Sequence, residues 1–84
     1  MLTVVTMREI EQVFEILADL GVSREAVTIP LKPAHPGGVR LLPDHRLEIV
    51  LDSQAPLADT LERVRAAIEA ILASPAGAAV QRDD

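Results

Sequence analysis

The sequence contains no cysteine, tryptophan, tyrosine or asparagine, and Phe14 is its one aromatic residue. Without cysteine, the chain has no disulfides, thiolate metal sites, iron–sulfur clusters or thiol nucleophiles. With one aromatic ring, the core must be built from leucine, isoleucine, valine and alanine. Lysine is also scarce: Lys32 is the one lysine of the sequence, against seven arginines. This bias is typical of a GC-rich bacterial genome, and scarce asparagine and cysteine also fit a thermophile.

Positive charge is in short supply. Thirteen acidic residues face eight basic ones, which gives a net charge of −5. An acidic domain is repelled by nucleic-acid backbones and by anionic membranes, so we expect neither as a partner. No apolar stretch approaches the ~18 residues of a membrane span, and the first residues lack the basic region of a signal peptide. The sequence therefore predicts a cytoplasmic protein.

A chain of 84 residues makes one small domain with a thin core. Hydrophobic residues form 49% of it and charged residues 25%, which is the balance of a globular protein and excludes wholesale disorder. The last ten residues show neither hydrophobic periodicity nor helix caps. We therefore expect a single domain over residues 1–74 and a flexible acidic tail over residues 75–84.

Two helices follow from local signals. Thr6 and Glu9 have the spacing of a capping box, and the apolar residues behind them recur at intervals of three and four up to Gly21, a typical helix end. This predicts a helix over residues 7–20. A second apolar face begins after Asp52, with Pro56 tolerated in the first turn, and ends before Pro75.

Three strands are predicted between the helices. Residues 27–31 alternate, and Pro30 places that strand at a sheet edge because proline donates no hydrogen bond. Residues 39–42 and 46–51, joined by a short turn, form a hairpin. Residues 2–6 are either a first strand or a lead-in. The set expected to face the helices is Val27, Ile29, Val39, Leu41, Leu47, Ile49 and Leu51.

The predicted class is therefore α+β, a (β)αβββα two-layer sandwich with two helices on one face of a three- or four-stranded, mostly antiparallel sheet. This order resembles that of double-stranded-RNA-binding domains, a family whose second helix begins with a lysine cluster that grips phosphates. Here residues 56–62 contain two acids and no lysine, so we exclude RNA binding.

The sheet face turned away from the helices is the first candidate binding surface. Leu42 and Val50 are expected to form a small apolar island with Arg40, Arg46 and Glu48 around it. An apolar centre with a charged rim is typical of association surfaces, and a twofold contact needs only one self-complementary patch. We therefore interpret the chain as a non-catalytic protein-interaction module that forms a homodimer through this face.

An alternative uses the first helix. Glu11, Glu15 and Asp19 lie four residues apart and stack like charges along one helix face. This acidic stripe would let a monomeric inhibitor or adaptor bind a basic protein partner. The simpler interpretation of the stripe is a solvated helix face.

The two histidines are the remaining candidates. His35 lies in a proline- and glycine-rich loop and His45 in the hairpin turn, and neither has the spacing of a metal site. The serines stand where helix caps stand, so no nucleophile–base pair is evident. We expect no catalytic residues, metal or cofactor. The one exception considered is an active site shared between two copies, where either histidine of one copy meets Asp44 or Asp52 of the other.

Overall fold

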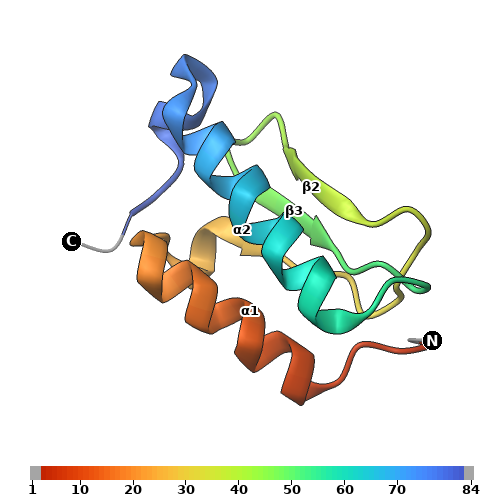
Figure 1. The fold of residues 1–84 in the computed structure, drawn as a ribbon. Coiled ribbons are helices and arrows are strands. Elements are labelled where there is room, and N and C mark those ends of the chain that lie inside the picture. Colours follow the sequence, from red (N-terminus) through yellow and green to blue (C-terminus); the bar gives the residue numbers. More distant parts are fainter. Residues whose placement is uncertain (1–2, 83–84) are drawn as a thin grey trace.

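The computed structural model describes residues 3–82. Its helices and strands, in chain order, are α1 (Met7–Leu20), η1 (Arg24–Ala26), β1 (Val27–Thr28), β2 (Gly38–Leu41), β3 (Leu47–Val50), α2 (Leu57–Ala73) and η2 (Pro75–Ala79). Figure 1 shows α1 and α2 on the same side of the sheet. The predicted α+β class, with two helices on one face of a three-stranded sheet, is thus confirmed.

Helix α1 begins and ends where its caps predict. The backbone N–H of Thr6 donates to Glu9 Oε1 at 3.1 Å, which is the return bond of the capping box. At the other end Gly21 has a φ of 72°, the left-handed conformation that glycine adopts without steric cost. Neither helix in residues 3–82 combines the length and the apolar character that crossing a bilayer requires.

The sheet has the strand order β1-β3-β2 and is mixed. β2 pairs antiparallel with β3, as the predicted hairpin requires, whereas β1 pairs with β3 in parallel. The parallel pair arises because the chain after β1 keeps running beside β3, as far as a bridge between Ala34 and Asp52. It then crosses the end of β3 and returns as β2 on the other side. Antiparallel pairing therefore accounts for one of the two strand pairs.

The segment before α1 is a lead-in. Residues 3–6 carry no strand, and Leu2 of the proposed first strand lies outside the described residues. Val5 is nonetheless buried, and its backbone N–H donates to the carbonyl of Leu31 at 2.8 Å. The segment therefore covers the edge of the sheet next to β1.

The core lies between the helices and the sheet. The predicted inward residues of β3 are fully buried, while Ile29, Val39 and Leu41 pack around the core with part of their surface exposed. The buried cluster consists of Val5, Val13, Leu17, Val22, Ala26, Val27, Leu47, Ile49, Leu51, Val64, Ile68 and Val80. As predicted, it contains no aromatic residue.

The predicted flexible tail is corrected by the structure. Residues 75–79 form η2, and Val80 is buried in the core cluster. The chain then lies beside the end of α1, where the backbone N–H of Ser23 donates to the carbonyl of Gln81 at 3.1 Å. The segment lacks periodicity because a five-residue helix is too short to show it, and one buried valine anchors it. Residues 83–84 lie outside the described chain.

Candidate functional site

One face of the sheet remains uncovered by the helices. Gly38, Arg40, Glu48 and Val50 alternate with core residues along β2 and β3 and therefore point to this face. Arg40 and Glu48 are paired across the two strands, and Arg40 Nε donates to Glu48 Oε1 at 2.7 Å. The Arg40 side chain is 70% exposed and that of Glu48 21% exposed. The centre of this face is thus an ion pair.

The predicted apolar island does not form, because the strand register separates its two members. Val50 lies opposite Gly38, whereas Leu42 bonds to Arg46 at the turn, with its backbone N–H 2.7 Å from the Arg46 carbonyl. Leu42 and Val50 are each half-buried, and Leu42 is offset by four residues, about 13 Å, from the position opposite Val50 along the hairpin. The Arg40–Glu48 pair occupies that space.

A shallow hollow of about 320 Å³ lies on this face beside the ion pair. Gly38, the first residue of β2, supplies no side chain to fill this space, and a Cβ built there would meet nothing within 4 Å. The residues that line it are Ala34, Pro36, Gly37, Gly38, Val39, Arg40, Glu48 and Val50. The alternation in the sequence predicted that Arg40, Glu48 and Val50 lie on this face. It did not predict that the loop residues reach the same face, because they do so only where the loop crosses β3.

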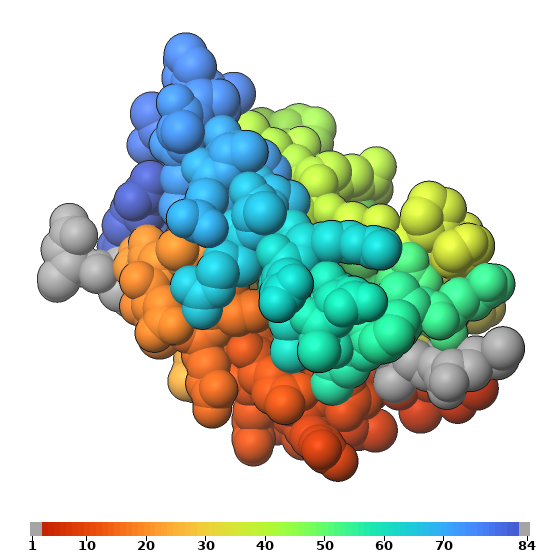
Figure 2. Space-filling model, viewed as in Figure 1, coloured from red at the N-terminus to blue at the C-terminus, as the bar shows by residue number. Residues whose placement is uncertain are grey.

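The outer edge of β2 presents free backbone groups. The Leu42–Arg46 bond shows that Leu42 turns its backbone N–H toward β3, so residues 38 and 40 do the same and Val39 and Leu41 face outward. No other segment of the described chain bonds to the backbone of these two residues. In Figure 2, β2 forms a rim of the molecule beside α2.

The loop that crosses β3 is held by Asp52, whose side chain is 5% exposed. The Nδ1 atom of His35 lies 3.1 Å from Asp52 Oδ1, and the backbone N–H of Gly37 is 3.4 Å from Oδ2. Two further backbone N–H groups, of Gln54 and Ala55, donate to Oδ1 at 2.8 and 3.0 Å. One carboxylate thus fixes both the crossing loop and the turn that leads into α2.

These hydrogen bonds hold the pKa of Asp52 well below its usual range. The backbone N–H of Gln54 contributes most, followed by the His35 side chain. Because an ionised carboxylate only accepts hydrogen bonds, His35 must carry a proton on Nδ1. Arg63 adds a more distant charge, with its Nη1 atom 4.0 Å from Asp52 Oδ2.

The His35–Asp52 pair lies within one chain, so these two residues meet without a second copy. An aspartate behind a histidine orients the ring for proton transfer or metal binding. In the part of the chain that the structure describes, however, no hydroxyl group bonds to His35, and no three metal-ligating side chains gather anywhere. The contacts of Asp52 with His35 and Gly37 anchor the crossing loop.

His45 is far from this cluster in the hairpin. It is exposed, and its φ of 66° makes it the left-handed residue of the turn. The neighbouring Asp44 accepts a hydrogen bond from the backbone N–H of Arg46 at 3.2 Å, so its carboxylate closes the same turn. Both residues therefore have a structural role here.

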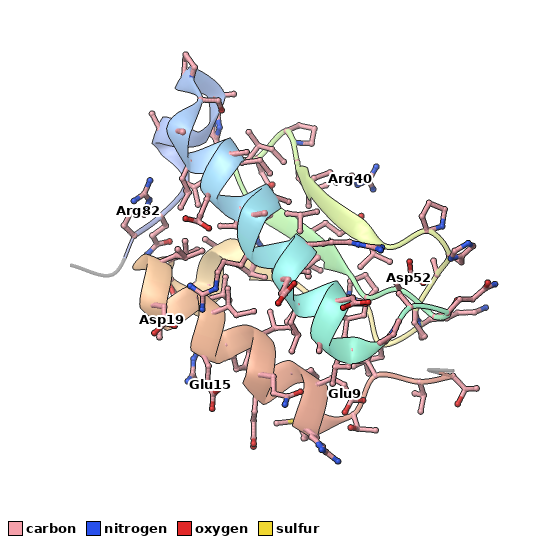
Figure 3. All side chains as sticks on the ribbon, in the orientation of Figure 1. Glu9, Glu15, Asp19, Arg40, Asp52 and Arg82 are labelled. Carbon is pink, nitrogen blue, oxygen red and sulfur yellow. The ribbon has the colours of Figure 1, made fainter. Side chains whose placement is uncertain are left out.

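The acidic stripe is partly neutralised by α2. Arg65 Nη2 donates to Asp19 Oδ2 at 2.9 Å, which ties the two helices together on their exposed side. Glu11 and Glu15 are exposed and have no ion-pair partner in residues 3–82. Figure 3 shows Glu15 and Asp19 on α1, away from Arg40 on β2. The stripe thus retains two free carboxylates rather than three.

Comparisons of the chain with protein-family models, with curated proteins and with solved structures find no match.

Proposed function

We propose that this chain is a non-catalytic protein-interaction module that pairs with a second copy of itself through the β2 side of its sheet. This side comprises the uncovered face around Arg40 and Glu48 together with the free edge of β2. The observation that carries the proposal is that both helices pack on the other face, and no other segment of the described chain bonds to the outer edge of β2. A two-layer domain normally buries only one sheet face by itself, and pairing would add to a core that is thin at this chain length.

The composition of the β2 side supports a self-complementary contact between two copies of the chain. It carries charges of both signs, Arg40 and Glu48, so two copies can approach without facing a surface of one sign. Half-buried Val50 and Leu42 flank the charges. A twofold axis needs only one such surface per chain.

The test is the absolute mass in solution, measured by light scattering on a size-exclusion column over a wide range of concentration. We expect a mass of about 18 kDa, twice the 9.0 kDa of one chain. A mass of 9.0 kDa at every concentration would overturn the proposal.

Two matched charge reversals locate the contact. Arg40→Glu and Arg65→Glu each remove an arginine from an ion pair and each change the net charge equally, but they lie on opposite sides of the molecule. Arg40→Glu should raise the dimer dissociation constant at least about tenfold, because it places like charges together at the contact. Arg65→Glu should leave the dimer intact. If both variants dimerise equally well, the contact lies elsewhere.

The acidic adaptor has less support. Its stripe loses Asp19 to Arg65, and the remaining carboxylates of Glu11 and Glu15 are what a solvated helix face ordinarily carries. Capture of a basic protein that weakens steeply with salt and with Glu15→Gln would favour it over self-association.

A further inference from the structure

We infer that β2 is the pairing element, and that two copies join their β2 edges antiparallel about a twofold axis at Val39 to form one continuous six-stranded sheet. The inference rests on the proposed function and adds the element, the register and the residues that meet.

The two edges of the sheet differ in how they are protected. The β1 edge is two residues long, and the chain that follows it carries Pro30 and Pro33. Its backbone at Leu31 already accepts a hydrogen bond from Val5. Prolines and covering segments are the usual means of blocking strand addition. The four residues of β2 include no proline, and no other segment of the described chain forms a backbone hydrogen bond with their outer edge.

A hollow lies on each face of the sheet beside Gly38 and Val39, the first two residues of β2. The 320 Å³ hollow is on the uncovered face, and a smaller one of about 120 Å³ lies on the helix side, between Val39 and α2. The fold itself does not demand glycine at position 38, because a Cβ there would meet nothing within 4 Å and its φ is not in the left-handed region. The space beside Gly38 is therefore available to a neighbouring strand.

Three antiparallel registers would pair the outward amides of two β2 edges, centred on Val39, Arg40 or Leu41. The Arg40-centred register sets two guanidinium groups directly opposite each other, where like charges repel. The Leu41-centred register places Val39 opposite Pro43, which has no N–H to donate. The Val39-centred register sets no like charges opposite each other and no proline opposite Val39 or Leu41. It places Leu41 opposite Gly37, whose N–H already bonds to Asp52, but it also sets Arg40 beside Gly38, so it is the one we assign.

In the Val39-centred register Gly38, Val39 and Arg40 each find a suitable neighbour. The two valines exchange backbone hydrogen bonds and pack against each other on the helix side, which extends the core across the axis. Arg40 of each copy lies beside Gly38 of the other, so its aliphatic stem covers the hollow there while its guanidinium stays with Glu48. The glycine and the long cation are thus complementary across the axis.

Single-cysteine variants read the register directly, because the chain has no cysteine of its own. Val39→Cys, Arg40→Cys and Leu41→Cys are each oxidised with oxidised glutathione and resolved by non-reducing electrophoresis, with Ala66→Cys on the exposed side of α2 as the control for random collision. Across the axis the Cα atoms at position 39 would lie about 5.5 Å apart, within disulfide reach. Those at position 40 would be about 8 Å apart, beyond it.

We expect Val39→Cys to form covalent dimers at least about tenfold faster than the other three variants. Fastest cross-linking at position 40 or 41 would overturn the register. A mass of about 18 kDa with no cross-linking above the Ala66→Cys control would overturn the edge contact and leave the proposed function standing. A mass of 9.0 kDa throughout would remove both.

A second pair of variants distinguishes the contribution of the Val39 backbone N–H to dimer affinity from that of the Val39 side chain. Val39→Pro removes an N–H that the chain's own sheet does not use, and Val39→Ala keeps it. If β2 edges pair, Val39→Pro should raise the dimer dissociation constant about tenfold more than Val39→Ala does. Equal constants for the two variants would overturn the inference.

Discussion

Gly37 crosses Asp52 so closely that the two backbones are in contact. A Cβ built on Gly37 would lie 2.6 Å from the backbone nitrogen of Asp52, a distance that real Cβ atoms essentially never show. The crossing of the loop over the end of β3 therefore depends on a glycine at this position. It also brings His35 to the Asp52 carboxylate, 17 residues away in the sequence.

Substitution of Gly37 by alanine should therefore destabilise the fold. Overpacking of this kind costs typically about 1–3 kcal/mol in the free energy of unfolding, and we expect a loss near the middle of that range. Urea denaturation followed by circular dichroism measures it. Gly38→Ala is the matched control, because a Cβ there meets nothing. It should be neutral or slightly stabilising, and equal losses for the two variants would contradict the close crossing.

Acid should destabilise the protein below about pH 4. The pKa of Asp52 lies well below its ordinary value of 3.8, and the Thr6 backbone and hydroxyl hold the pKa of Glu9 below 4.5. The unfolded chain then binds protons at these sites before the folded chain does, so the free energy of unfolding begins to fall near about pH 5 and is clearly lower below about pH 4. Well above about pH 5 the contribution is complete.

Asp52→Asn tests the part that Asp52 plays in this pH dependence. The variant should be less stable at neutral pH and should lose less stability than the parent between pH 4 and pH 2. Asp59→Asn, an exposed substitution on α2, is the control and should keep the parent slope. An unchanged slope in Asp52→Asn would mean that this carboxylate is not held ionised by the fold.

His45→Gly should stabilise the hairpin. At a φ of 66° a residue with a Cβ costs roughly 1 kcal/mol relative to glycine, although histidine tolerates the conformation better than most. We expect the free energy of unfolding to rise by about 0.5–1 kcal/mol. Asp44→Gly, one residue earlier in the turn, should instead lower it, because it removes the bond to Arg46. A loss of stability in His45→Gly would show a contact that the turn geometry does not reveal.

Gly77→Ala should detach η2 from the end of α2. A Cβ on Gly77 would overlap the carbonyl oxygen of Ile71, so η2 and the buried Val80 behind it would have to move. We expect faster hydrogen exchange at the amide of Ser23, which bonds to the Gln81 carbonyl. Ala78→Ser, an exposed change in the same segment, should leave that amide protected.

Features encoded by neighbouring residues could be predicted from the sequence. The capping box at Thr6, the end of α1 at Gly21 and the antiparallel hairpin depend on spacings of a few residues, and each lies where the sequence placed it. The alternation of buried and exposed residues on β3 follows from the pleat in the same way.

Features that depend on how distant segments meet could not be predicted. The parallel β1–β3 pair, the His35–Asp52 contact and the separation of Leu42 from Val50 all depend on register or on the crossing loop. Asp52 gave one local signal, because an aspartate before a helix often accepts backbone bonds. Its long-range partners left no trace in the sequence.

The position of β3 between its neighbours also governs the order in which the sheet can be assembled. Every strand pair in the sheet includes β3, the last strand in the chain, and β1 and β2 never pair with each other. During synthesis, no native strand pair can form until residues 47–50 have emerged. The hairpin with β2 then closes over a short loop, whereas β1 must be recruited across about twenty residues, at a greater entropic cost. Until β3 has been synthesised, neither β1 nor β2 has a partner strand in the sheet.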